Sequence, residues 1–257
     1  MLSPRRSKLP RRTRGNPASI IPELIWSSRS APRPLSPGGI VRTWQLLLLA
    51  AIGVVIAVPG FSSPEGATVP ALTYTKTMKG SVPAYEKVVV RSDGTGEYDS
   101  QSASESLLTR GLRLSPAVTH KLFSLAARLH DFKGVELESH KRVANLGLKT
   151  FRYQDGSEMN EVQFNYSLNH TAQELTDLFE SVASVERHIV ALDYAMRYDP
   201  LGLPRQLELI QADLDNKALV DPQLMAATLN RIIANPRYMH LAQMRAEDIL
   251  QQIQDKK

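Results

Sequence analysis

The feature that most constrains this chain is an apolar run of thirteen residues, 46–58, which contains no charged or polar side chain. As a helix it would extend about 20 Å, which is short of the roughly 30 Å hydrocarbon core of a bilayer. Apolar runs of about 7–15 residues that follow a cationic segment are typical of secretory signal peptides. We therefore interpret residues 46–61 as a signal peptide or, if it is not cleaved, as a membrane anchor.

Residues 1–45, upstream of this run, form a basic leader. The leader contains seven prolines, and nine Lys or Arg residues against the single acid Glu23, which gives it a net charge of about +8. Proline at this density disrupts regular helices and strands, so we expect the leader to be disordered. Alternatively, translation begins at Val41, and the leader then lies upstream of the true start.

Two small residues, Gly60 and Ser62, suit cleavage by a signal peptidase, which would leave Ser63 as the mature N-terminus. The pair is not Ala-x-Ala, so an uncleaved anchor is the alternative. In both cases the basic leader stays on the cytoplasmic side and the rest of the chain is exported. We expect an extracytoplasmic protein that is periplasmic, secreted, or held at the inner membrane by an N-terminal helix.

The charge of the chain is unevenly distributed. The whole chain carries +5, so residues 46–257 carry −3 once the +8 of the leader is removed. A slightly acidic folded part lacks the electrostatic basis for binding nucleic acid, and no nucleic-acid partner is expected. The chain has no cysteine, which excludes disulfides, thiolate metal sites and a cysteine nucleophile.

Residues 62–72 are rich in Ser, Pro and Gly, as is typical of a linker. Beyond them, residues 73–170 have the pattern of a small α+β domain. Two hairpins are expected, over 85–98 and 148–166, because β-branched or aromatic runs flank an Asp-Gly pair that suits a tight turn. A third strand is expected over 107–114.

Helical patterns occur in two places. Ser115 and Pro116 are typical of a helix start, and apolar residues follow them at helical spacing. Residues 171–257 are helical throughout in their periodicity and are expected to begin with one long helix. Shorter helices are expected at 204–214, 222–234 and 236–253. The predicted fold class is α+β: a small antiparallel sheet of two hairpins with a packed helix, then a long helix and a C-terminal helical region.

The chain has no glycine-rich phosphate loop, no Gly-x-Ser-x-Gly elbow and no His-Glu-x-x-His motif, so no catalytic or cofactor-binding residues are predicted. The most suggestive polar cluster is Glu136, Glu138 and His140. These residues alternate along a segment that, if extended, would project all three to one side, where they would suit a divalent cation. A solvated loop that simply carries charges is the alternative.

Residues 81–98, SVPAYEKVVVRSDGTGEY, resemble a bacterial envelope domain of unknown function. In that family a proline-aromatic pair leads into a strand, an Asp-Gly turn and a return strand that ends in tyrosine. The later helix and second hairpin are compatible with the family, so the resemblance covers residues 80–166. It implies a small exported α+β domain and transfers no catalytic residue.

The leading functional hypothesis is a non-enzymatic binding module, exported or membrane-tethered, that uses its sheet or its helical region against a protein partner. One alternative is an envelope hydrolase or metal-dependent enzyme centred on Glu136, Glu138 and His140. The other is a structural envelope protein that self-associates through its C-terminal helices. No cofactor is predicted, and contact with the membrane is expected only through residues 46–61.

Overall fold

The computed structural model of the protein describes residues 69–102 and 106–255. The predicted leader 1–45, the signal or anchor segment 46–61 and the first residues of the linker, 62–68, lie outside the described residues. None of the helices in the described part combines the length and the apolar character that a membrane span requires.

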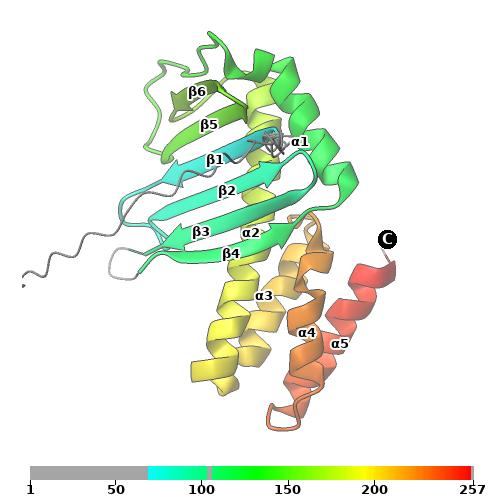
Figure 1. Cartoon of the computed structure of the whole chain (residues 1–257). Coiled ribbons are helices and arrows are strands. Elements are labelled where there is room, and N and C mark those ends of the chain that lie inside the picture. Colours follow the sequence, from blue (N-terminus) through cyan, green and yellow to red (C-terminus); the bar gives the residue numbers. More distant parts are fainter. Residues whose placement is uncertain (1–68, 103–105, 256–257) are drawn as a thin grey trace, which may run out of the picture. The chain divides into compact units, whose positions relative to one another are not determined.

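In this part of the chain six strands form a single antiparallel sheet (Figure 1), and together with the helices they confirm the predicted α+β fold. Across the sheet the strands lie in the order β4-β3-β2-β1-β5-β6. The two predicted hairpins are β2–β3 and β5–β6, and the predicted third strand is β4. The strands are β1 (Ala71–Thr77), β2 (Tyr85–Arg91), β3 (Thr95–Gln101), β4 (Leu108–Arg113), β5 (Leu148–Asp155) and β6 (Glu158–Phe164).

Strand β1 is the strand that the sequence patterns did not predict. It begins at Ala71, inside the segment predicted as a linker, and it lies at the centre of the sheet between β2 and β5. Its alternate residues Leu72 and Tyr74 are buried, whereas Thr73 and Thr75 on the opposite face are half-buried. The strand joins the two hairpins into one sheet by pairing with both.

The turn of the first hairpin forms as predicted. Gly94 has φ +82°, which a residue without a Cβ adopts at little cost. The Asp93 carboxylate accepts hydrogen bonds from the amide of Thr95 at 2.9 Å and from its hydroxyl at 2.6 Å. The Asp-Gly pair therefore sets the register between β2 and β3 through its own backbone conformation and side-chain contacts.

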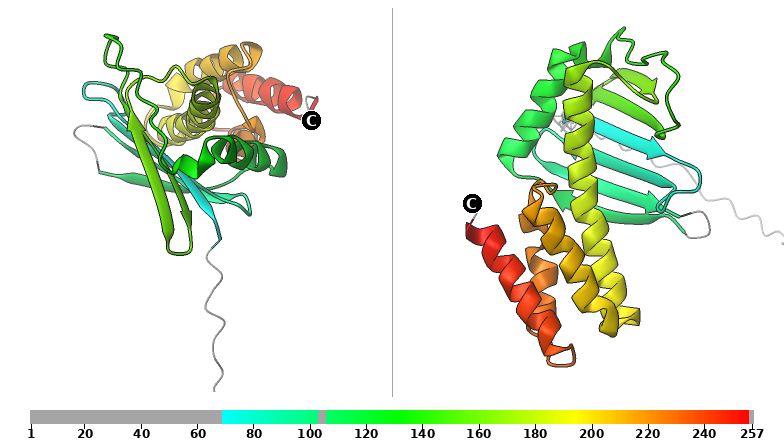
Figure 2. Two further views of the ribbon diagram at one scale, coloured as in Figure 1. Left: turned by 90° about the horizontal axis from the view of Figure 1, so that it is seen from above. Right: turned by 180° about the vertical axis from the view of Figure 1, so that it is seen from behind.

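Two helices, α1 (Pro116–Arg128) and α2 (His170–Tyr198), cover one face of the sheet (Figure 2). The Ser115 hydroxyl caps α1 as predicted, by accepting a hydrogen bond from the amide of Val118 at 3.4 Å. Asn169 caps α2 by accepting from the amides of Thr171 and Ala172. Each cap satisfies an amide at a helix start that has no partner within its helix.

The C-terminal region is helical, as predicted. Its last helix starts at His240, four residues later than expected, because a turn that includes Pro236 precedes it. The remaining helical elements are η1 (His130–Phe132), η2 (Pro200–Gly202), α3 (Leu203–Asp215), η3 (Pro222–Met225), α4 (Ala226–Ile233) and α5 (His240–Asp255).

Helix α2 contributes to two hydrophobic cores. Its N-terminal half packs on the sheet together with α1, where Phe179 stacks against Tyr74 with ring centroids 5.3 Å apart. Its C-terminal half packs against α3 and α4 through residues such as Ile189 and Leu192, in a core to which α5 also contributes. The predicted α+β domain 73–170 and helical region 171–257 therefore share this helix.

Glu86 on β2 joins the sheet to α2 from a buried position, with 8% of the residue exposed. It accepts a hydrogen bond from the Tyr98 hydroxyl at 2.8 Å, and its two carboxylate oxygens lie 2.7 and 2.9 Å from Nη1 of Arg187 on α2. Burial and the nearby charge of Glu86 raise the pKa of Tyr98 well above its ordinary value. The phenol therefore stays protonated and donates to the carboxylate.

Arg110 on β4 makes a second link to α2. Its guanidinium lies 3.1 Å from the carboxylate of Glu186 and 3.0 Å from that of Asp193. Glu186 is only 1% exposed, and burial raises the pKa of its carboxyl although Arg110 opposes the rise. Removing one partner of a buried ion pair leaves the other charge desolvated, so these contacts restrict where α2 can lie on the sheet.

Alanine substitutions at two glycines of the sheet test its packing. A Cβ on Gly96 in β3 would overlap the main-chain oxygen of Val89 on β2, so Gly96→Ala is expected to lower the free energy of unfolding by about 1–3 kcal/mol. Gly111 in β4 is the matched control because a Cβ there meets no atom within 4 Å; Gly111→Ala should stay within about 0.5 kcal/mol of the parent. Urea unfolding followed by circular dichroism measures both, and equal stabilities for the two variants would contradict the packing.

Candidate functional site

The sheet has one covered face and one open face. Helices α1 and α2 both lie on the covered side (Figure 2). Because side chains alternate along a strand, every second residue of each strand points away from the helices. On β1 these residues begin with Ala71 and end with Thr77, and on β2 they begin with Tyr85 and end with Arg91. The open face is therefore a continuous surface built from alternate residues of neighbouring strands.

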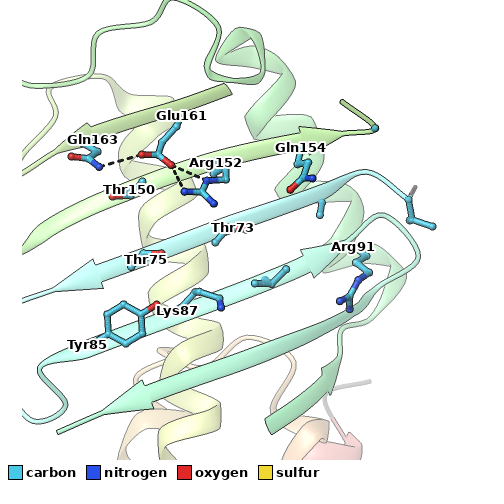
Figure 3. A pocket seen from close by; sticks show the side chains of 14 residues that line it. Thr73, Thr75, Tyr85, Lys87, Arg91, Thr150, Arg152, Gln154, Glu161 and Gln163 are labelled. Carbon is cyan, nitrogen blue, oxygen red and sulfur yellow. Dashed lines mark hydrogen bonds and ion pairs between the residues drawn. The ribbon is translucent and has the colours of Figure 1, made fainter. Parts of the chain in front are cut away.

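A trough of about 770 Å³ lies on this open face (Figure 3). It follows β1 and is bordered by β2 on one side and by β5 and β6 on the other. The lining residues are mainly polar and come from four strands and their flanking turns. They are Val69, Ala71, Thr73, Thr75, Tyr85, Lys87, Val89, Arg91, Thr150, Arg152, Gln154, Gly156, Glu161 and Gln163.

The floor of the trough consists of small side chains. Thr75 on β1 pairs in register with Thr150 on β5, and Thr73 pairs with Val89 on β2. Longer side chains border this floor, and Figure 3 shows Lys87, Arg91 and Arg152 among them. Small residues in the middle strand and long ones beside it give the face its hollow shape.

Within the described residues, three ion pairs connect neighbouring strands on this face. Lys87 pairs with Asp99 at 2.6 Å, and Arg91 pairs with Glu97 at 2.8 Å, both between β2 and β3. Between β5 and β6, the Arg152 guanidinium lies 2.6 Å from the carboxylate of Glu161. In each pair the cation stands on the strand nearer to β1 and the acid on the strand farther away.

The pair Lys87–Asp99 keeps its charges at neutral pH. Burial acts to raise the pKa of Asp99, but the hydrogen bond from Lys87 and the other favourable contacts outweigh it and hold the pKa below its ordinary value. The same contact with Asp99 raises the pKa of Lys87. The ion pair between Lys87 and Asp99 therefore stabilises the charged form of both groups.

The side chains of the trough are suited to binding. Threonine hydroxyls and glutamine amides donate and accept hydrogen bonds, and the cations donate several each. Among the described residues that line the trough there is no histidine, and the whole chain lacks cysteine. The lining therefore offers hydrogen bonds and charge to a ligand.

The three predicted metal-ligand candidates lie in the loop after η1 and do not converge. His140 Nε2 is 2.6 Å from a Glu136 carboxylate oxygen, and both side chains are largely exposed. Glu138 is directed elsewhere and accepts hydrogen bonds from the amides of Asn165 at 2.6 Å and Ser139 at 2.9 Å. In the part of the chain that the structure describes, no three His, Asp or Glu side chains gather as a metal ion would require.

Sequence reasoning missed the trough because it missed β1, which supplies the floor. The signal was present in the segment ALTYTKT, where Leu72 and Tyr74 alternate with Thr73 and Thr75 at a period of two. The mixed polar composition next to a Pro- and Gly-containing stretch hides this alternation. The cross-strand ion pairs depend on register, so they become visible only once the strands are paired.

Comparison of the sequence with models of known protein families gives no match, and comparison with curated proteins gives none either.

The two carboxylates of the predicted metal cluster should differ in their effect on stability. The Asn165 amide, together with other main-chain amides, lowers the pKa of Glu138, whereas Glu136 is exposed. Glu138→Gln is expected to cost on the order of 1 kcal/mol at pH 7, because hydrogen bonds to a charged acceptor are stronger than those to a neutral one. Glu136→Gln should change stability by less than about 0.5 kcal/mol.

The effect of Glu138→Gln on the free energy of unfolding should depend on pH. Because the folded-state pKa of Glu138 lies below the ordinary value of 4.5, its stabilisation is present above that value and is lost as the pH falls through the lowered pKa. The free energies of unfolding of the parent and of Glu138→Gln, measured by chemical unfolding at pH 7, 5 and 3, should converge as the pH falls. A difference that stays constant over this range would show that the charge of Glu138 is not the cause.

Proposed function

We propose that the protein is a non-enzymatic binding module of the cell envelope, exported or membrane-tethered, that holds a protein partner on the open face of its sheet. The observation that carries the proposal is the trough over β1, with its floor of small residues between rows of long polar side chains. The other face of the sheet is occupied by helices α1 and α2.

The proposed location rests on the N-terminal sequence. A leader with a net charge of about +8 precedes the apolar run 46–58, which is the order found in secretory signals and in single N-terminal anchors. In this proposal the sheet and the C-terminal helices lie outside the cytoplasm. Residues 46–61 contact the membrane if they are not cleaved.

The shape of the trough supports an extended segment as the bound element. The seven residues of β1 span roughly 23 Å at 3.3 Å per residue. A peptide of six or seven extended residues has the same length and presents main-chain donors and acceptors along its whole course. The threonine hydroxyls and the amides of Gln154 and Gln163 supply matching groups of both kinds.

Site-specific photo-cross-linking in intact cells tests this proposal. Thr73 on the trough floor is replaced by benzoyl-phenylalanine in the full chain, and Ser124, exposed on α1, is replaced in the same way as the control. A discrete protein cross-linked from position 73 and not from position 124 is expected. The purified partner should then bind the full chain at least tenfold more weakly after Thr73→Arg, which fills the trough, and equally well after Ser124→Arg.

Two results would contradict the proposal. One is cross-linking from position 73 that does not exceed that from position 124. The other is a purified partner whose affinity is unaffected by Thr73→Arg while circular dichroism shows that the variant is folded.

A further inference from the structure

The three cations of the trough are spaced at regular levels along β1. Lys87 lies in register with Thr75, and Arg91 lies in register with Ala71. Between them, on the opposite side of β1, Arg152 lies in register with Thr73. Successive cations are thus two strand residues apart, or about 6.6 Å along the strand direction.

The charge of the trough favours an anionic ligand. Its lining contains these three cations and one acid, Glu161. The other two acids of the ion pairs, Glu97 and Asp99, stand behind the cations on β3 and do not line the trough. A group that enters over β1 therefore meets the cations before it meets these two acids.

The ion pairs leave hydrogen-bond donors unused. A lysine has three N–H donors and an arginine has five. Within the described residues, Lys87 donates one hydrogen bond to Asp99, and Arg91 donates one to Glu97. Both contacts of Arg152 go to one carboxylate oxygen of Glu161. Each cation can therefore donate to a ligand without giving up its present partner.

An extended peptide matches this spacing. In a strand, residues i, i+2 and i+4 point to the same side and are separated by about 6.6 Å. We propose that the trough binds an extended acidic segment of a protein, in which carboxylates at i, i+2 and i+4 face Lys87, Arg152 and Arg91 in turn. This inference rests on the proposed function and adds to it the chemistry and the spacing of the bound segment.

Peptides of equal composition test the spacing. Fluorescein-labelled Ser-Glu-Ser-Glu-Ser-Glu-Ser is titrated with the full chain and compared with Ser-Ser-Glu-Glu-Glu-Ser-Ser by fluorescence anisotropy. The alternating peptide is expected to bind at least about fivefold more tightly, since only it can form all three exposed ion pairs, each of which contributes a small factor. Its lysine counterpart should not bind, and added salt should weaken the binding.

Substitutions identify the groups responsible. Arg152→Gln is expected to abolish the preference for the alternating peptide. Arg205→Gln is the matched control, because Arg205 is an exposed, ion-paired arginine of α3 and lies outside the trough. This variant should still prefer the alternating peptide. Circular dichroism checks that both variants are folded.

Three outcomes would overturn the inference: equal affinity for the two glutamate peptides, tight binding of the lysine peptide, or binding of an alginate oligosaccharide where the alternating peptide fails. If a partner cross-links from position 73 and binds through the trough but neither glutamate peptide is preferred, the charge inference is wrong and the proposed function stands. If position 73 yields no specific partner either, both are wrong.

Discussion

The packing of α2 across the sheet is the interaction on which the rest of the structure depends. Its N-terminal half packs on one face of the sheet together with α1, and its C-terminal half packs against α3 and α4 in the second hydrophobic core. Glu86 with Arg187, and Arg110 with Glu186, fix the helix to the strands through charges that are costly to leave unpaired. One face of the sheet is therefore covered by packed helices, and the other face is open.

Charged side chains are placed differently on the two faces of the sheet. On the covered face, acids such as Glu86 and Glu186 are almost fully buried and have structural partners. On the open face, the partly exposed pair Arg91–Glu97 contributes at most about 1 kcal/mol. Stability alone does not require cations to stand beside β1 with their acids behind them. The proposed acidic ligand would give this order a use, while the pair Lys87–Asp99 also has a structural role because Asp99 is only 5% exposed.

The sequence predicted those elements whose structure is determined locally. The Asp93–Gly94 turn and the Ser115 cap are formed by contacts within a few residues. In α2, apolar residues recur at helical spacing over a stretch long enough to predict a helix from the sequence. Strand β1 has only the short alternation in ALTYTKT as a local signal, because its pairing with β2 and β5 is decided by residues far away in the chain. The trough could not be predicted for the same reason. The prediction from Glu136, Glu138 and His140 assumed an extended segment, whereas His140 has φ +52° and Glu138 accepts hydrogen bonds from main-chain amides.

Threonine-methyl NMR of the full chain, with the alternating glutamate peptide added, tests most directly whether the open face is the binding surface. Thr73, Thr75 and Thr150 line the trough, whereas Thr119 and Thr176 are buried on the helical side. Binding in the trough predicts chemical-shift changes at the first three methyl groups and none at the last two. Shifts confined to Thr119, Thr176 or the C-terminal helices would contradict it.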